Sequence, residues 1–105
     1  TRRGVAIESL VSGGCIVSGH VERSLMFSGV RVHSYARVDW SVLLPNVQVG
    51  RGARISRAVV DRGCIIPDGL VIGEDAALDA ARFLRTTSGI TLVTRQMLLN
   101  LPKTP

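Results

Sequence analysis

Aromatic side chains are scarce in this chain, at 4% of 105 residues, although hydrophobic residues make up 46% of it. The apolar residues are therefore mostly Val, Ile, Leu and Ala, which suit narrow, repetitive β-structure better than a large globular interior. The length fits one domain and is small for a whole enzyme. No apolar run approaches the ~18 residues of a membrane span and no signal stretch opens the chain, so we expect a cytoplasmic protein without a membrane partner. The first residue is Thr rather than Met, which suggests a fragment or a processed product.

Lysine and cysteine are also scarce. Of the 13 basic residues only Lys103 is a lysine, and the net charge is +5. Arginine presents a planar fork suited to phosphate or carboxylate, so the arginines either bind anionic metabolites or form a solvated basic surface. Nucleic acid is not an expected partner, because no basic run is interleaved with aromatic residues. Two cysteines are too few for a disulfide scaffold, and we interpret Cys15 and Cys64 as buried thiols.

Catalytic motifs are missing as well. The sequence has no G-x-x-x-x-G-K-[ST] motif, no nucleotide-type glycine loop and no Ser/His/Asp set. Nothing in it can position two phosphorylated substrates and a metal ion. We therefore expect this chain to contain no catalytic residues, no metal site and no cofactor, and to be inactive alone.

A 17-residue repeat organises the first three quarters of the chain. Residues 15–31, 32–48 and 49–65 are successive copies, and residues 66–72 begin another. When the copies are aligned, residues of like chemistry fall into columns. Four columns are apolar, one holds small residues, and one holds residues that tolerate positive φ at a repeated tight corner. In that order, they are Cys15/Val32/Val49/Ile66, Val21/Val38/Ile55/Ile72, Leu25/Val42/Val59, Val30/Val47/Cys64, Gly19/Ala36/Ala53 and Gly29/Asn46/Gly63.

The apolar positions within each copy recur about six residues apart, which is typical of hexapeptide repeats. This period predicts a mainly β fold, a single-stranded left-handed parallel β-helix of about four coils, whose like residues stack inside a triangular prism. We assign residues 1–73 to the β-helix and residues 74–105 to a tail of the same domain.

The tail has a different pattern. Residues 74–85 predict a short amphipathic helix with an apolar stripe, and this helix is expected to cover an end or side of the prism. A turn over 86–89, a strand over 90–94 and a last helical turn or two over 95–101 follow. The stripe comprises Ala77, Leu78, Ala81 and Leu84.

Outward positions of the repeat carry polar residues that the spacing leaves open to several interpretations. His20 and His33 resemble the general base of hexapeptide acyltransferases in type, but neither has an acidic partner in its column, which favours surface histidines. Arg37 and Arg54 share the column of His20, and Trp40 lies between Arg23 and Arg57 in another. These columns are either solvated, with packing on Trp40, or form an oligomer contact or an anion site.

The spacing alone leaves two interpretations for Arg62, which either pairs with Asp61 or reaches a phosphate. The role of Arg95 is equally ambiguous on spacing alone.

Four strings combine into a more specific pattern. They are SGGCIVSG (12–19), SLMFSGVRVHSYARVDWSVLLPNVQVGRGARI (24–55), VVDRGCIIPDGLVIGED (59–75) and GITLVTRQML (89–98). Together they resemble the C-terminal end of the bacterial glucose-1-phosphate adenylyltransferase (ADP-glucose pyrophosphorylase) family, over residues ~5–100.

The resemblance implies a role within a larger enzyme. In the family, an N-terminal catalytic domain of the same chain uses Mg²⁺ to join ATP and glucose 1-phosphate into ADP-glucose, for glycogen synthesis. The C-terminal β-helix supports a homotetramer and helps to form sites for phosphorylated effectors, such as the activator fructose 1,6-bisphosphate and the inhibitor AMP. A free-standing hexapeptide acyltransferase and a purely structural β-helix of another sugar-nucleotide transferase are the alternatives.

The resemblance also implies effector-binding residues. Arg62 matches an arginine that contacts AMP, and Arg95 matches one that contacts the sugar bisphosphate. Asn46 stands where relatives have an acidic nucleotide contact, and Leu99 where they have a second activator-contacting arginine. The other residues of the segment after Arg95 that we assign to the effector site are Gln96, Met97 and Leu98.

Overall fold

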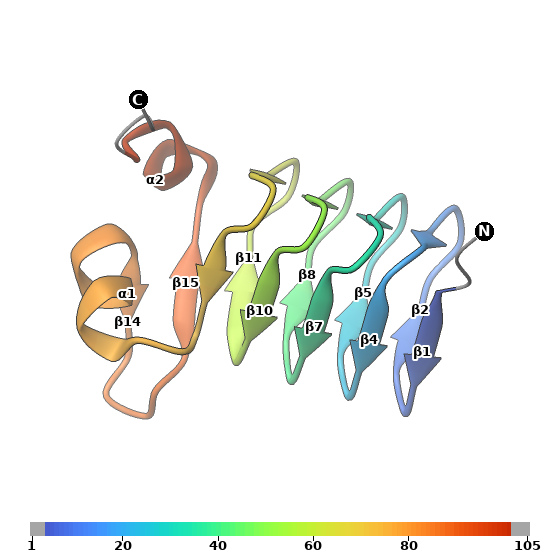
Figure 1. Cartoon of the computed structure of the whole chain (residues 1–105), viewed down its shortest axis with the longest axis horizontal. Coiled ribbons are helices and arrows are strands. Elements are labelled where there is room, and N and C mark those ends of the chain that lie inside the picture. Colours follow the sequence, from blue (N-terminus) through green and yellow to red (C-terminus); the bar gives the residue numbers. More distant parts are fainter. Residues whose placement is uncertain (1–3, 102–105) are drawn as a thin grey trace.

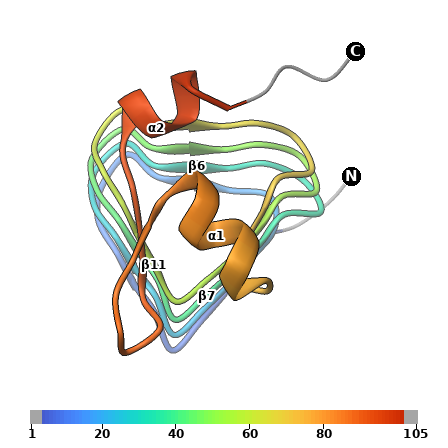
Figure 2. The ribbon, with the colours of Figure 1, turned by 90° about the vertical axis from the view of Figure 1, so that its left-hand side faces the viewer.

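Residues 4–101 of the computed structural model form a left-handed parallel β-helix of about four coils, followed by a tail with two short helices (Figure 1). Each coil contributes a short strand to each of three sheets, so that the chain traces a triangle when it is viewed along the axis (Figure 2). The fold predicted from the repeat is confirmed.

Three sheets form the sides of the prism, and we name them faces A, B and C. Face A contains β1 (Val5–Ile7), β4 (His20–Glu22), β7 (Arg37–Asp39), β10 (Arg54–Ser56) and β13 (Val71–Ile72). Face B contains β2 (Leu10–Val11), β5 (Leu25–Met26), β8 (Val42–Leu43), β11 (Ala58–Val60), β15 (Thr91–Val93) and β14 (Leu84–Arg85). Face C contains β3 (Ile16–Val17), β6 (Arg31–Val32), β9 (Gln48–Val49) and β12 (Ile65–Ile66).

The 17-residue register creates the core. Val38 pairs with Val21 on one side and Ile55 on the other, and all three are at most 1% exposed. Val49 pairs in the same way with Val32 and Ile66. Because each inward side chain lies on an equivalent one from the next coil, small branched residues fill the narrow interior without aromatic rings.

One of the predicted columns is wrong in its first member. The first coil pairs with the second at a spacing of 15 residues, so Val17 rather than Cys15 lies opposite Val32. The corner between β3 and β4 is two residues shorter than the next one, which accounts for this spacing. Cys15 lies on the first coil and is only partly buried, contrary to our expectation. The column that begins with Leu25 pairs as predicted but points outward, because Met26 fills the interior instead.

Corners of the prism require left-handed backbone. The predicted turn column is confirmed, since Gly29, Asn46 and Gly63 have φ of 72°, 64° and 70°. The corner between faces A and B is made by larger residues, including Arg23 and Trp40, whose φ values are 48° and 51°. Left-handed φ costs such residues roughly 1–2 kcal/mol each.

A ladder of serines follows the corner between faces A and B. The backbone N–H of Ser24 donates to Ser9 Oγ (3.1 Å), that of Ser41 to Ser24 Oγ (3.0 Å) and that of Ala58 to Ser41 Oγ (3.2 Å). Each hydroxyl in turn donates to the carbonyl two residues before it. The buried hydroxyls are therefore satisfied, and the ladder stabilises the corner from coil to coil.

Helix α1 (Ala76–Arg82) covers the C-terminal end of the prism, as Figure 2 shows. Its buried residue is Asp79, whose Oδ2 accepts the Gly73 N–H (2.9 Å) and whose Oδ1 accepts from Arg82 (3.2 Å). Arg82 also donates to the Val71 carbonyl (2.8 Å). The open ends of the last strands expose polar backbone, and a charged pair satisfies these groups where an apolar stripe cannot.

The prediction of a helix over 74–85 is therefore wrong in two respects: the length of the helix and the side that it buries. It ends at Arg82, and Leu84 and Arg85 form β14. The predicted stripe of Ala77, Leu78, Ala81 and Leu84 is exposed.

The rest of the tail agrees with the sequence pattern. Gly89 N–H donates to the Thr86 carbonyl (3.0 Å) in the predicted turn, and β15 then pairs in parallel with β11. Helix α2 (Arg95–Leu99) begins after Thr94, whose side chain accepts from the Met97 N–H. Among residues 4–101, no helix is long and apolar enough to cross a membrane.

Val38→Asp should unfold the prism, because it places an unpaired charge at a fully buried position on the middle coil. The cost of several kcal/mol is comparable to the whole stability of a small domain, about 5–15 kcal/mol. The control is Arg37→Asp, one residue away on the outward side, which should shift stability by about 0.5 kcal/mol or less. The measurement is thermal melting followed by circular dichroism, and equal melting of the two variants would contradict the register.

Asp79→Asn should destabilise the domain by about 3 kcal/mol, because it leaves Arg82 without its charged partner at the covered end of the prism. Asp75→Asn is the matched control on the same helix, since asparagine caps a helix as well as aspartate does. Urea unfolding of both variants gives the comparison. Equal midpoints would show that Asp79 does not hold α1 on the prism.

Candidate functional site

The candidate site lies at the corner between faces B and C on the last coil. Asp61 Oδ1 accepts the Arg62 backbone N–H (2.8 Å), and Gly63 N–H donates to the Pro45 carbonyl of the preceding coil (3.0 Å). These contacts fix the backbone of the tight corner. The guanidinium of Arg62 is exposed beside it and makes no ion pair with Asp61.

Arg95 reaches the same corner from the tail. It is the first residue of α2, and α2 packs beside β12. A Cβ added to Gly63 would lie 3.6 Å from Arg95 Cδ and 3.9 Å from its Nη1. The Arg95 side chain therefore lies over the corner at van der Waals distance. Arg62 and Arg95, which are 33 positions apart in sequence, thus both lie beside Gly63.

Neither arginine has a protein partner for its charge. Within the described part of the chain, the arginines in ion pairs are Arg23, Arg54 and Arg82. The exposed guanidinium groups of Arg62 and Arg95 keep all their side-chain donors available to solvent or to a ligand. Two such groups at one corner can hold a phosphate through charge-assisted hydrogen bonds.

A shallow hollow of about 220 Å³ adjoins this corner. The hollow is lined by the cationic side chain of Arg95 and by apolar surface. The lining residues are Gly63, Ile65, Arg95, Leu98 and Leu99. Ile65 is 66% exposed and Leu99 is 78% exposed, so both present apolar surface to a ligand. The sequence pattern did not single out Ile65, although its place in the outward column of Arg31 and Gln48 is a signal of exposure.

The other predicted site residues lie in different settings. Asn46 forms the equivalent corner one coil earlier and is exposed, and its side-chain amide lies over Gly29 of the coil before it. Gln96 is exposed and donates to Asn100 (3.3 Å). Met97 and Leu98 pack against the hydrophobic core, and Leu98 also lines the hollow. The structure thus brings Arg62 and Arg95 to one corner and leaves Asn46 one coil away, while Met97 serves mainly to seat α2.

Cys64 lies directly behind the corner and is fully buried. Burial, with a contribution from the nearby Asp61 charge, raises the pKa of its thiol to about 11, against a partial lowering by Arg95. The thiol therefore stays protonated near neutral pH and serves as a packing residue.

His20 belongs to a network of charged side chains on the first coils. His20 Nε2 lies 3.0 Å from Glu22 Oε1, so it has the acidic neighbour that its own column lacks. The hydrogen bond from His20 is the largest cause that lowers the pKa of Glu22; desolvation opposes it, and the charge of Arg23 adds to the lowering. Glu22 also pairs with Arg23, which in turn reaches Glu8 (3.3 Å). This chain of charges ties the first coils together on the surface.

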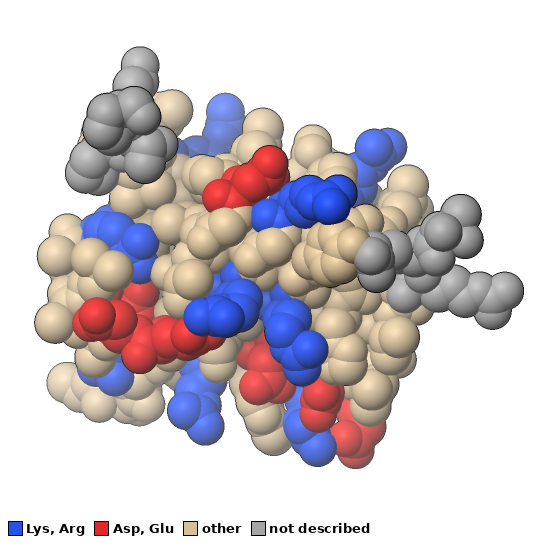
Figure 3. Space-filling view, viewed as in Figure 1, with Lys and Arg blue, Asp and Glu red and all other residues tan. Residues whose placement is uncertain are grey.

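Charge is mixed over the surface in view in Figure 3, where acidic side chains lie beside basic ones. A nucleic-acid interface needs a basic stripe, which this face does not present. No group of three or more His, Cys, Asp or Glu side chains within residues 4–101 is placed to hold a metal ion.

Thiol labelling tests the environment behind the corner. At pH 8 we expect a disulfide reagent to modify Cys15, which is partly exposed, at least tenfold faster than Cys64, which should react only on unfolding. The Cys15→Ser variant should lose the fast phase. Loss of the fast phase in Cys64→Ser instead would contradict the burial of this thiol.

Comparisons with known proteins agree with the geometry. Residues 1–93 match the family model described as GlmU-like, C-terminal hexapeptide. The chain is 59% identical over 99 residues to the glucose-1-phosphate adenylyltransferase of Bradyrhizobium diazoefficiens, covering 93% of the chain and 24% of that protein. The enzymes of the same name from Paramagnetospirillum magneticum (59% over 98 residues; 92% and 23% covered) and Teredinibacter turnerae (59% over 99 residues; 92% and 24% covered) are similar to it as well.

The chain spans about a quarter of the length of these relatives and matches their C-terminal region. Its coils, its corners and the family model, which covers nearly the whole chain, lead to one assignment. The chain belongs to the GlmU-like, C-terminal hexapeptide family.

Proposed function

We propose that this chain is the C-terminal regulatory and subunit-contact domain of a glucose-1-phosphate adenylyltransferase. The complete enzyme would join ATP and glucose 1-phosphate to give ADP-glucose and pyrophosphate, the step that supplies glycogen synthesis. The identity of 59% to enzymes of that name supports the assignment. The observation that carries the regulatory role is the pair of exposed, unpaired arginines, Arg62 and Arg95, around Gly63.

In this proposal the corner binds phosphorylated effectors. Arg62 would contact the phosphate of AMP and Arg95 a phosphate of fructose 1,6-bisphosphate, with Asn46 and the backbone of residues 96–98 nearby. The stacked coils hold Arg62 on a rigid support, so little ordering free energy is lost when a phosphate binds. An effector held here and by other parts of the enzyme would favour one arrangement of the subunits.

Catalysis is assigned to the remainder of the enzyme. ATP and Mg²⁺ would bind in the preceding catalytic domain, and this chain alone would be inactive. The complete enzyme would assemble as a homotetramer in the cytoplasm, where its phosphorylated substrates occur. A hexapeptide acyltransferase is less well supported, because the relatives described above are named as adenylyltransferases.

Arg62→Ala and Arg95→Ala in the complete enzyme should each weaken effector response and leave unactivated turnover nearly unchanged. A lost charge-assisted hydrogen bond is worth about 1.5–3 kcal/mol, so the effector concentration for half-maximal response should rise about tenfold or more. We expect Arg62→Ala to act mainly on AMP inhibition and Arg95→Ala mainly on activation by fructose 1,6-bisphosphate. Steady-state rates over a range of effector concentrations give both values.

Arg37→Ala is the matched control, because Arg37 is an exposed arginine on face A without an ion pair in the described chain. It should leave both response curves in place. Unchanged curves in Arg62→Ala and Arg95→Ala would refute the proposed site, and an equal shift in all three variants would indicate a general effect of net charge.

A further inference from the structure

A pocket of about 510 Å³ opens at the corner between faces A and C, and we call it the A–C pocket. This volume lies within the range of small-molecule sites, about 300–1,000 Å³. Three successive coils contribute to its wall. The side chains that matter for binding are His33, Gln48, Arg51, Ile65, Pro67 and Asp68.

A missing side chain gives the pocket its depth. His33, Gly50 and Pro67 are 17 residues apart and form one column at the corner, and the middle member of this column has no side chain. A Cβ at Gly50 would lie 2.5 Å from the Ile66 carbonyl oxygen and 2.6 Å from Asp68 Oδ1, so no larger residue fits there. The hollow is therefore built into the backbone of the corner.

Arg51 is held at the pocket without the use of its side-chain donors. Its guanidinium lies over the Tyr35 ring, 4.7 Å from the ring centroid. Stacking of this kind engages the flat side of the guanidinium, so the N–H groups in its plane remain available. Within residues 4–101, Arg51 forms no ion pair that would occupy these groups. A guanidinium positioned in this way loses little freedom when it binds a ligand.

Hydrogen-bond acceptors stand beside these donors. Asp68 Oδ1 accepts the Arg51 backbone N–H (2.8 Å), which fixes the carboxylate and leaves Oδ2 for a ligand. Gln48 is exposed next to them, and its amide can donate and accept. A hydroxyl group also donates and accepts, so it can bind an acceptor and a donor of this wall together.

The charges favour a neutral ligand over an anion. The side chains of Arg51 and Asp68 have opposite charges, so a phosphate bound to the guanidinium would also face a carboxylate. Apolar surface completes the wall, because Ile65 is 66% exposed and Pro67 is exposed beside it. A ligand that suits this lining has several hydroxyl groups and one apolar side, as a sugar ring does.

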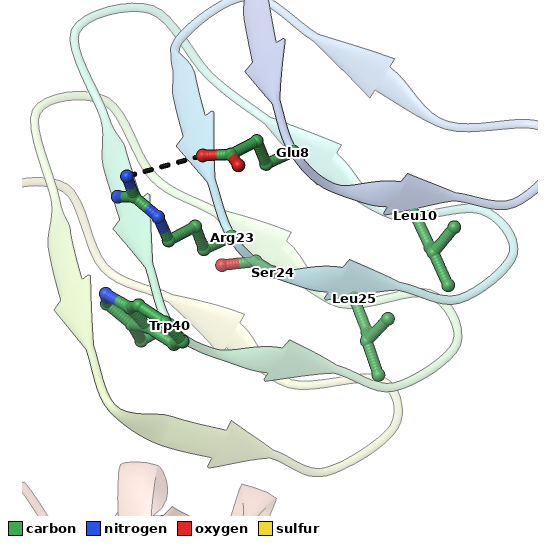
Figure 4. Close-up of a pocket in the computed structure, with 6 residues that line it drawn as sticks. All are labelled: Glu8, Leu10, Arg23, Ser24, Leu25 and Trp40. Carbon is green, nitrogen blue, oxygen red and sulfur yellow. Dashed lines mark ion pairs between the residues drawn. The ribbon is translucent and has the colours of Figure 1, made fainter.

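The hollow on the first coils differs in chemistry (Figure 4). Glu8 and Arg23 lie along it and pair with each other at 3.3 Å. Leu10, Leu25 and Trp40 provide its apolar walls. Its charged groups thus satisfy one another, whereas the donors of Arg51 and the free oxygen of Asp68 do not.

We propose that the A–C pocket binds a pyranose ring of a neutral glucan. The ring hydroxyls donate to Asp68 and accept from Arg51 and Gln48, and the C–H side of the ring packs on Ile65. The choice of a glucan rests on the proposed function, in which the enzyme supplies glucosyl units for glycogen synthesis. Because Ile65 also lines the hollow at the candidate effector corner, the bound sugar lies next to that corner.

Affinity electrophoresis of the complete enzyme tests the proposal, with glycogen in the gel as the probe. We expect glycogen to slow the migration of the enzyme and added maltotriose to reverse this effect. In Asp68→Asn the amide oxygen still accepts the Arg51 N–H, but a nitrogen replaces the free oxygen. Asp68→Asn and Arg51→Gln should each weaken binding about tenfold, because each removes a charge-assisted hydrogen bond. Arg37→Gln, an exposed arginine on face A, is the control and should bind as the wild type does.

Other outcomes would overturn the proposal. Migration that glycogen does not change would show that no glucan binds. Equal retardation of Asp68→Asn, Arg51→Gln and Arg37→Gln, each checked for folding by circular dichroism, would place the sugar elsewhere on the enzyme. Reversal by inorganic phosphate but not by maltotriose would show an anion site. Formation of ADP-glucose by the same preparation is measured separately, so failure of the glucan site and failure of the proposed function are distinguishable.

Discussion

In-register pairing of each coil with the next is the constraint on which the rest of this structure depends. Parallel backbone hydrogen bonds join residues 17 positions apart from the second coil onward and 15 apart between the first two, so side chains of neighbouring coils lie on one another. The core, the left-handed corners and the serine ladder all repeat because this register repeats. A one-residue slip of a coil would turn its inward side chains outward, because successive side chains of a strand point to opposite sides.

Much of the fold follows from the sequence because the repeat makes register visible. The columns of Val38 and Val49 and the corner at Gly63 lie where the 17-residue period places them. The first coil departs from prediction because a corner is two residues shorter, which no column chemistry reveals. The Leu25 column pairs as predicted, but periodicity alone cannot tell inward from outward there, because both sides of face B are apolar.

The C-terminal end and the candidate site required three-dimensional information for a different reason. An apolar stripe normally indicates the buried side of a helix, but α1 buries Asp79, since the end of the prism offers polar backbone groups. The sequence could suggest Arg62 and Arg95 only through resemblance, because 33 residues separate them. The passage of β15 along β11 brings Arg95 over Gly63, and this pairing turns two distant arginines into one candidate phosphate site.

The most direct test of the account is a crystal structure of the complete enzyme with fructose 1,6-bisphosphate bound. The account predicts that the coils keep their 17-residue register and that a phosphate oxygen lies within hydrogen-bonding distance of the Arg95 guanidinium, beside Gly63. An effector bound away from this corner, with Arg62 and Arg95 still facing solvent, would contradict it.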